Sequence, residues 1–207
     1  MDDGGDRERG GVAEAGRMRR KGWFRIPGVQ EGERTLAQQM KGLTPALAAA
    51  PGRSVLDLGC AEGLIALEFA RAGARSVRAL DCNMELLATA RVMQAGLAKN
   101  QGRASVEFEA GNVADLVAAP GERYDLVLAL AIVHKMRRPA ALLKYIAQVC
   151  GELAVLRLPK GSRGEFTTKW YGIACDVNRE LAGHGLTLEQ QLPGPDGELV
   201  QYWRAAA

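Results

Sequence analysis

Two carboxylates and two glycines around one turn are the residues of this chain best suited to hold a ligand. Asp57 and Gly59 come at the end of a short apolar run, and Gly63 closes the turn four residues later. A buried strand that ends in a tight turn before a helix directs the positive end of the helix dipole toward the gap. Asp81 lies at the end of the next apolar segment. This arrangement indicates a site for a nucleoside-bearing cofactor.

The spacing of the glycines argues against a dinucleotide such as NAD. The dinucleotide fingerprint G-x-G-x-x-G needs three glycines so that the backbone approaches the pyrophosphate and the helix packs closely. Counted from Gly59, the second and third glycine positions hold Ala61 and Leu64, and Gly63 comes one position early. NAD binding is therefore disfavoured.

Apolar segments that alternate with helical segments must position this turn. We expect strands at residues 54–58, 76–81, 104–110, 124–131 and 152–158, with helices at about 62–72, 84–98, 113–118 and 139–150 between them. This alternation with short connections predicts an α/β fold with a doubly wound, mostly parallel sheet. Right-handed crossovers place a ligand at the carboxyl ends of the strands, where Gly59, Asp81, Asn112 and His134 fall.

The regions before and after these segments complete the expected fold. Helical spacing predicts one helix over residues 35–47, capped by Thr35 and packed beside the sheet. The expected helix at 139–150 opens at Pro139 and closes at Gly151. A loop at 159–170, a helix at about 172–183 and two strands at 186–192 and 199–203 follow. A Pro/Gly-rich turn between those two strands predicts a C-terminal β-hairpin, with an antiparallel strand inserted at one edge of the sheet.

Composition favours one globular domain inside the cell. The 207 residues suffice for one α/β domain, and a formal net charge of +3 permits nucleic-acid contact without requiring it. Residues 1–22 are charged and glycine-rich, so we expect a disordered tail followed by a domain at 23–207. The longest apolar run, Leu126–Val133, is too short to span a bilayer, and we expect a cytoplasmic protein with no membrane partner. Four scattered cysteines predict free thiols and no metal site: Cys60, Cys82, Cys150 and Cys175.

The glycine turn resembles motif I of class I S-adenosylmethionine-dependent methyltransferases, which commonly reads Asp-x-Gly-x-Gly-x-Gly. Asp57, Gly59 and Gly63 match this pattern, while Ala61 replaces the middle glycine. The resemblance extends over residues 53–158 in segment order and motif spacing, and the terminal hairpin agrees with the family's reversed last strand. It implies a Rossmann-like methyltransferase fold with a seven-stranded sheet, and S-adenosyl-L-methionine as cofactor.

The resemblance also implies roles for single residues. Gly59 and its turn would contact the methionine part of the cofactor, and Asp57 would act through water or the ammonium group. Asp81 would accept both ribose hydroxyls, a bidentate use that needs a carboxylate. Asn112 occupies the position that reads the adenine amino group, although it could instead make an Asx turn. The implied cofactor-binding set is Asp57, Gly59, Cys60, Ala61, Gly63, Asp81, Cys82, Met84, Asn112, Val113 and Ala129.

One histidine is a candidate catalytic base. His134 follows the apolar run that ends the fourth expected strand, and the segment resembles the corresponding stretch of small-molecule and some RNA methyltransferases. At the mouth of the expected cleft it could deprotonate the acceptor; alternatively it packs over the cofactor or bonds a loop carbonyl. The Asn/Asp-Pro-Pro-aromatic signature of DNA-adenine methyltransferases is missing from the sequence, so that reaction is disfavoured.

The acceptor is less well defined by the sequence. Substrate-facing candidates lie in Arg25–Thr35 and Lys160–Tyr171, with Arg137 and Arg138 adding positive charge. A loop that mixes cations with aromatic residues suits a stacked base or an anionic aromatic molecule, or it is a basic surface loop. We expect O-methylation of a small or medium-sized metabolite. The alternatives are a tRNA-type RNA methyltransferase and a non-catalytic scaffold that binds the cofactor, and the oligomeric state stays open.

Overall fold

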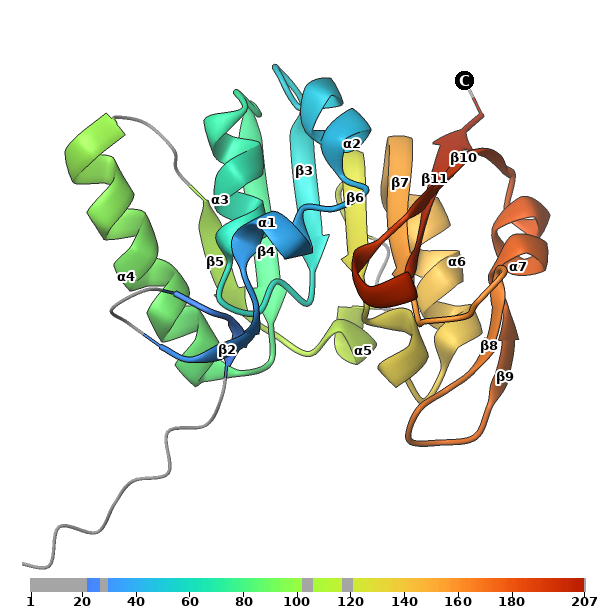
Figure 1. Ribbon diagram of the computed structural model, residues 1–207. Helices are drawn as coiled ribbons and strands as arrows, with labels where there is room; N and C mark the ends of the chain where they lie inside the picture. The colour runs from blue at the N-terminus through green and yellow to red at the C-terminus, as the bar shows by residue number, and fades with distance from the viewer. Residues whose placement is uncertain (1–21, 27–29, 102–105, 117–120, 207) are drawn as a thin grey trace, which may run out of the picture.

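A seven-stranded sheet in the order β10-β11-β7-β6-β3-β4-β5 forms the centre of the computed structural model (Figure 1). The structure describes residues 22–26, 30–101, 106–116 and 121–206. The parallel strands are β3 (Ser54–Leu58), β4 (Ser76–Asp81), β5 (Glu107–Ala110), β6 (Tyr124–Leu130) and β7 (Cys150–Leu158). The last strand, β11 (Leu199–Ala205), inserts antiparallel between β7 and β10 (Leu186–Pro193). The predicted doubly wound fold and its terminal hairpin are confirmed.

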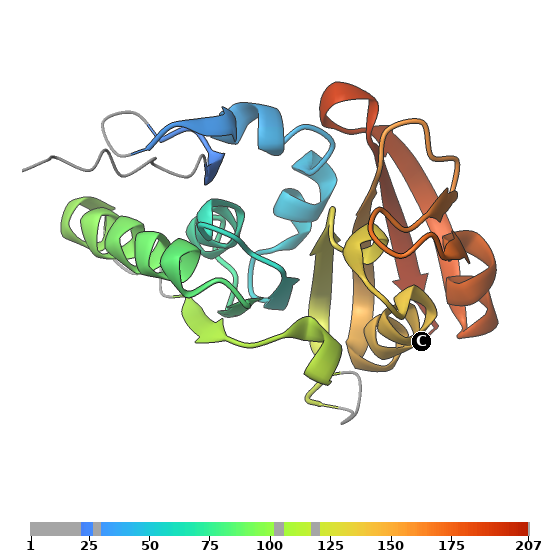
Figure 2. The same ribbon diagram turned by 90° about the horizontal axis from the view of Figure 1, so that it is seen from below.

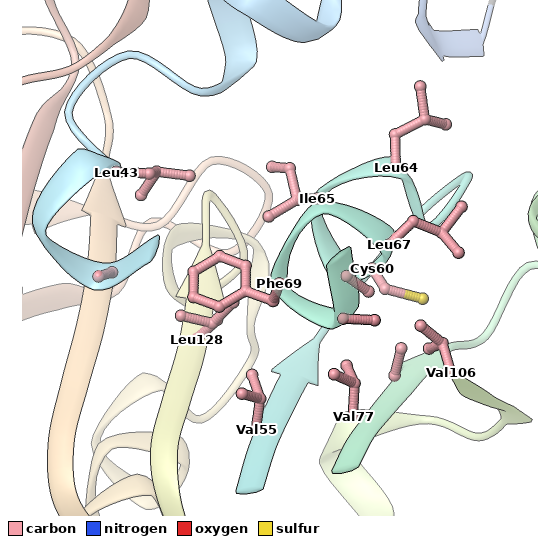
Figure 3. Packing of buried hydrophobic residues seen from close by; sticks show 14 of the residues in the cluster. Leu43, Val55, Cys60, Leu64, Ile65, Leu67, Phe69, Val77, Val106 and Leu128 are labelled. Atoms are coloured by element: carbon pink, nitrogen blue, oxygen red, sulfur yellow. The ribbon is translucent and has the colours of Figure 1, made fainter. Parts of the chain in front are cut away.

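Helices cover both faces of the sheet, and each face has its own apolar cluster. On one face lie α1 (Leu36–Gln39), α2 (Thr44–Ala49), α3 (Leu64–Arg71) and α4 (Met84–Gln101), and on the other α5 (Val113–Leu116), α6 (Pro139–Val149) and α7 (Val177–Gly183). Figure 3 shows Phe69 of α3 packed toward Val55 and Leu128 of the sheet. Strand β3 is buried along its whole length, as a strand covered on both faces must be. Burial on both sides holds the glycine turn at the end of β3 in place.

The single helix predicted over residues 35–47 is wrong, because two short helices replace it. Thr35 does cap the first one: its side chain accepts a hydrogen bond from the Gln38 N–H. Pro45 lies in the first turn of α2, where its missing N–H leaves no gap in the hydrogen bonding. Inside one continuous helix the same proline would remove a hydrogen bond and clash with the preceding turn. Pro45 therefore accounts for the break between α1 and α2.

Residues 159–183 also differ from the prediction. The expected loop and the first turn of the expected helix contain a small hairpin, β8 (Glu165–Thr167) paired antiparallel with β9 (Ala174–Asp176). Helix α7 starts only after this hairpin, where Asp176 caps it by accepting from the Arg179 N–H at 2.9 Å. Gly151 does not close the preceding helix either, because α6 runs directly into β7 and Gly151 lies within that strand.

A parallel strand pair that the sequence did not predict lies at the carboxyl ends of the sheet strands. Strands β1 (Gly22–Phe24) and β2 (Gly32–Arg34) have three residues each, too few to show a period. Figure 2, which looks onto the strand ends, shows this pair (blue) next to α1 on the same side of the sheet as α3 and α4, with α5 on the opposite side. The buried Glu62 anchors the pair: its Oε1 accepts from the Trp23 N–H at 2.8 Å and from the Gln30 amide at 2.6 Å.

The expected tail falls almost entirely outside the described residues, apart from Gly22, which belongs to β1. Within the described part of the chain, the helices are all too short or too polar to cross a membrane.

Candidate functional site

A cavity of about 540 Å³ lies at the carboxyl ends of β3, β4 and β6. Its volume is in the range of sites that hold a cofactor or a small molecule. Residues from the strand ends, the β1–β2 pair, α1, α5 and the β8–β9 turn line it, among them Trp23, Gln39, Asp57, Asp81, Asn112, Leu130, Lys135, Lys169, Trp170 and Tyr171. Segments far apart in the sequence therefore enclose one space. It lies between the neighbouring strands β3 and β6, where the connection after β3 crosses one face of the sheet and the connection after β6 crosses the other face.

The glycine turn has a backbone that side chains rarely tolerate. Gly63 caps α3 with φ +70°, and a Cβ at this position would lie 2.3 Å from the Phe108 ring. Ala61 adopts φ +50°, a conformation that costs a residue with a Cβ about 1–2 kcal/mol. This strain explains why a glycine is the usual residue at that place in the motif that the turn resembles. The turn is held in an unfavourable conformation at the wall of the cavity, as is typical of binding sites.

Asp81 fastens the glycine turn to the start of α4. Its Oδ2 accepts a hydrogen bond from the Ala61 N–H at 2.9 Å, and its Oδ1 accepts from the Asn83 N–H at 2.8 Å. A carboxylate offers about four acceptor positions, so two remain for a ligand. The two backbone bonds fix the carboxylate plane, which suits it to receive a pair of neighbouring hydroxyl groups.

Asp57 is the buried carboxylate of the site, with 2% of its surface exposed. Burial and, to a smaller extent, the negative charge of Asp81 raise the pKa of its carboxyl group from 3.8 to about 7, while the positive charge of Arg157 opposes this rise. Within the described part of the chain, no hydrogen bond reaches the Asp57 carboxylate. A cationic N–H group placed in the cavity would therefore supply both the missing donor and the missing positive charge.

A buried arginine orients one of the cavity-lining side chains. Arg157 in β7 donates from one terminal nitrogen to Gln39 Oε1 at 2.7 Å and from the other to the Gln39 carbonyl. Its Nε lies 3.7 Å from a carboxylate oxygen of Glu198, and burial lowers the pKa of the guanidinium to about 10. Because arginine only donates, Gln39 must turn its amide oxygen toward it. The amide nitrogen of Gln39 is then the end that can face the cavity.

His134, predicted at the mouth of the cavity, is not among the residues that line it. Its ring meets Phe166 edge-on at 6.3 Å, and its buried Nδ1 has no hydrogen-bond partner within the described residues. Burial, with the charges of Lys135 and Lys169, lowers the pKa of His134 to about 4. The next residue, Lys135, lines the cavity instead, with its Nζ 4.0 Å from the centre of the Trp23 ring.

The structure brings most of the predicted cofactor residues together. Eight of them line the cavity: Asp57, Gly59, Cys60, Ala61, Asp81, Cys82, Asn112 and Val113. Gly63, Met84 and Ala129 do not, because Gly63 packs against Phe108, Met84 is 59% exposed on α4, and Ala129 is buried in β6.

The side-chain oxygen of Asn112 accepts from the Ala114 N–H at 3.0 Å, which is the Asx-turn alternative, while the residue still lines the cavity. Gln39 and Lys135 line the cavity but were not predicted as site residues. Only the position of Lys135 next to the candidate base His134 could have pointed to it. The described residues contain no group of three or more His, Cys, Asp or Glu side chains placed to hold a metal ion.

Comparison with known proteins identifies similar chains. Residues 55–152 match the family model described as a methyltransferase domain. A ubiquinone biosynthesis O-methyltransferase from Neisseria meningitidis is 34% identical over 98 residues, which are 47% of this chain and 40% of that protein, so the match spans less than half of that relative. The enzyme of the same name from Xanthomonas campestris is 29% identical over 209 residues, covering 89% of this chain and 82% of its own length.

A solved structure shares the fold. The magnesium protoporphyrin IX methyltransferase from Synechocystis, crystallised with bound SAM, superposes with a TM-score of 0.61 at 20% identity. The superposition covers 78% of this chain and 76% of that one. At this identity the likeness concerns the fold alone.

Proposed function

We propose that this chain, which belongs to the class I S-adenosylmethionine-dependent methyltransferase family, transfers a methyl group from S-adenosylmethionine to a hydroxyl oxygen of a small or medium-sized molecule. The observation that carries the proposal is the placement of Asp57 and Asp81 at the ends of adjacent strands, on either side of one strained turn and in one cavity. Oxygen as the acceptor atom is supported by the names of the two O-methyltransferase relatives. The comparisons favour neither the RNA alternative nor the non-catalytic scaffold.

The residues of the cavity fit the cofactor. S-adenosylmethionine supplies a methyl group on a positively charged sulfur, which leaves as a neutral thioether, while the acceptor hydroxyl group releases its proton to water. Asp81 would hold the ribose through its two remaining acceptor positions, and Asp57 would receive the ammonium group of the methionine part. Side chains from β1 and η1 (Val133–Lys135) line the same space. The contribution of the chain is positioning, since transfer needs the acceptor oxygen in line with the methyl group.

We expect Asp81→Asn to weaken the binding of S-adenosylhomocysteine about ten- to hundredfold, equivalent to about 1–3 kcal/mol. Asparagine lacks the negative charge, and its NH₂ group would face one of the two backbone N–H groups that now donate hydrogen bonds to Asp81. Titration calorimetry measures the change. Asp115→Asn on α5, which alters an exposed carboxylate away from the cavity lining, is the matched control. Equal affinities of wild type and Asp81→Asn would contradict the cofactor assignment.

Labelled methyl transfer tests the acceptor class directly. Cell extract is fractionated, treated or not with ribonuclease, and incubated with the protein and S-adenosylmethionine labelled in the methyl group. Label in a ribonuclease-resistant small-molecule fraction is the expected outcome. Label that ribonuclease removes would point to RNA, and binding of S-adenosylhomocysteine without any transfer would indicate a scaffold.

His134→Ala is expected to leave the methyl-transfer rate within about fivefold of wild type, because the side chain lies outside the cavity lining. A general base would instead make the rate fall about 10²- to 10⁴-fold. Single-turnover rates with saturating cofactor separate these outcomes. The thermal unfolding midpoint is followed in parallel, since loss of the contact with Phe166 should lower stability slightly without touching the chemistry.

A further inference from the structure

We propose that Lys135 and Lys169 form a subsite that recognises an acidic group on a planar aromatic methyl acceptor. Both lysines line the cavity, and neither forms an ion pair within the described residues. The proposal rests on the proposed function, because it concerns the acceptor's part of the same cavity. It names the chemical class of the acceptor, which the comparisons leave open for this chain.

Lys135 is held in place without a carboxylate partner. Its Nζ lies 4.0 Å from the centre of the Trp23 ring, a cation–π distance that fixes the ammonium at the cavity wall. The carboxylates that influence it are Asp81, Glu33 and Glu198. Asp81 is bonded to two backbone amides, and Glu198 forms a bidentate pair with Arg34. Glu33 is exposed on β2 and forms no ion pair with Lys135 within the described residues. The positive charge of Lys135 is therefore left for a ligand.

A backbone hydrogen bond brings the second lysine to the first. The Lys169 N–H donates to the His134 carbonyl at 2.8 Å, so the β8–β9 turn lies directly beside η1. Burial lowers the pKa of Lys135, and the charge of Lys169 lowers it further. Two ammonium groups that repel each other in a partly buried space are both stabilised by one anion.

The turn that carries Lys169 is held by hydrogen bonds and also presents aromatic side chains. The buried Thr168 closes it: its Oγ1 accepts from the Ile173 N–H at 2.9 Å, and its own N–H donates to the Ile173 carbonyl at 2.8 Å. Trp170 and Tyr171 lie on this turn, line the cavity, and are 62% and 50% exposed. Large aromatic side chains exposed together at the edge of a cavity are typical of a binding surface for a flat, apolar ligand.

Charges of opposite sign line the cavity on different structural elements. Asp57 and Asp81 provide the negative charge beside the glycine turn, whereas the lysines lie on η1 and the β8–β9 turn. An acidic acceptor is attracted to the lysines and repelled by the aspartates, so its charge fixes which end of the molecule points toward the transferred methyl group. A neutral acceptor would have no such orientation.

The test compares an anionic probe, 3,4-dihydroxybenzoate, with its uncharged methyl ester. Each is titrated into full-length protein saturated with S-adenosylhomocysteine, and binding is followed by calorimetry. We expect wild type to bind the acid at least about tenfold more tightly than the ester. Lys135→Met and Lys169→Met should each reduce this preference, and the double variant should abolish it. Lys144→Met, which removes an exposed lysine on α6 away from the cavity, should keep the full preference.

Separate outcomes bear on the two proposals. Equal affinity of wild type for acid and ester, no binding of either probe, or an equal loss in Lys144→Met would overturn the subsite. Failure of S-adenosylhomocysteine to bind wild type, measured first, would count against the proposed function instead. Lysine-dependent, salt-sensitive binding of tRNA without binding of the acid would overturn the small-molecule subsite and assign the lysines to phosphate groups.

Discussion

Arg157→Met is expected to lower the free energy of unfolding by about 3–5 kcal/mol, the usual cost of removing one member of a buried charged network. Arg157 is 2% exposed and donates to both the carbonyl and the side-chain oxygen of Gln39. Methionine fills a similar space but donates no hydrogen bond, so both oxygens of Gln39 would lose their partner. Asp57 would also lose the positive charge that partly offsets its burial.

Urea unfolding followed by circular dichroism measures this loss. The control is Arg204→Met on the neighbouring strand β11, where an arginine forms an exposed pair with Glu189 at 2.9 Å. Exposed pairs contribute about 0–1 kcal/mol, so the control should change stability little. Equal losses in the two variants would show that Arg157 is no more important than a surface cation.

Asp57→Asn is expected to stabilise the cofactor-free protein at pH 8 while weakening the binding of S-adenosylhomocysteine about 30- to 1,000-fold, or about 2–4 kcal/mol. The folded protein binds the Asp57 proton more tightly than the unfolded chain, because burial raises the pKa from 3.8 to about 7. Ionisation of Asp57 therefore opposes folding, and its contribution to stability falls as the pH rises from about 4 to about 7. Asparagine removes this cost together with the carboxylate that we propose as the partner of the cofactor's ammonium group.

The size and sign of the effect can be measured against pH. A pKa difference of about three units corresponds to ~4 kcal/mol at most, and we expect a gain of about 2–3 kcal/mol at pH 8 that shrinks toward pH 5. Thermal unfolding of wild type and variant at both pH values tests this. The affinity of wild type for S-adenosylhomocysteine should rise between pH 6 and pH 8 as Asp57 ionises, and that of the variant should not. A variant less stable than wild type at pH 8 would contradict the assigned cost of burial.

The part of the site that could be predicted depends on residues close together in the chain. Strands β3 and β4 have the predicted bounds, because each is a short apolar run between turn residues. The glycine turn, Asp57 and Asp81 follow from these strands, since parallel neighbours bring their carboxyl ends to one edge. Their place in the cavity needed no information beyond the order of the elements.

The residues that were missed depend on contacts between distant parts of the chain. Arg157 lies 118 positions from the Gln39 it orients, and Glu62 lies 39 positions from the Trp23 amide that it anchors. Neither strand of the β1–β2 pair is long enough to show a strand periodicity in the sequence. The position of the pair therefore depends on its contacts with Glu62 and with the edge of the sheet. The part of the cavity lining that the β1–β2 pair contributes could therefore be identified only from the folded structure.

By itself, the sequence determined the sheet, the glycine turn and the two carboxylates beside it, because apolar runs and tight turns are local. Only the tertiary structure decided which residue after β6 meets the cavity. His134 and Lys135 are neighbours in a 3₁₀ turn, where three residues complete one turn and adjacent side chains point about 120° apart. They cannot share a face, and the packing of Phe166 on His134 and of Trp23 on Lys135 selects the lysine.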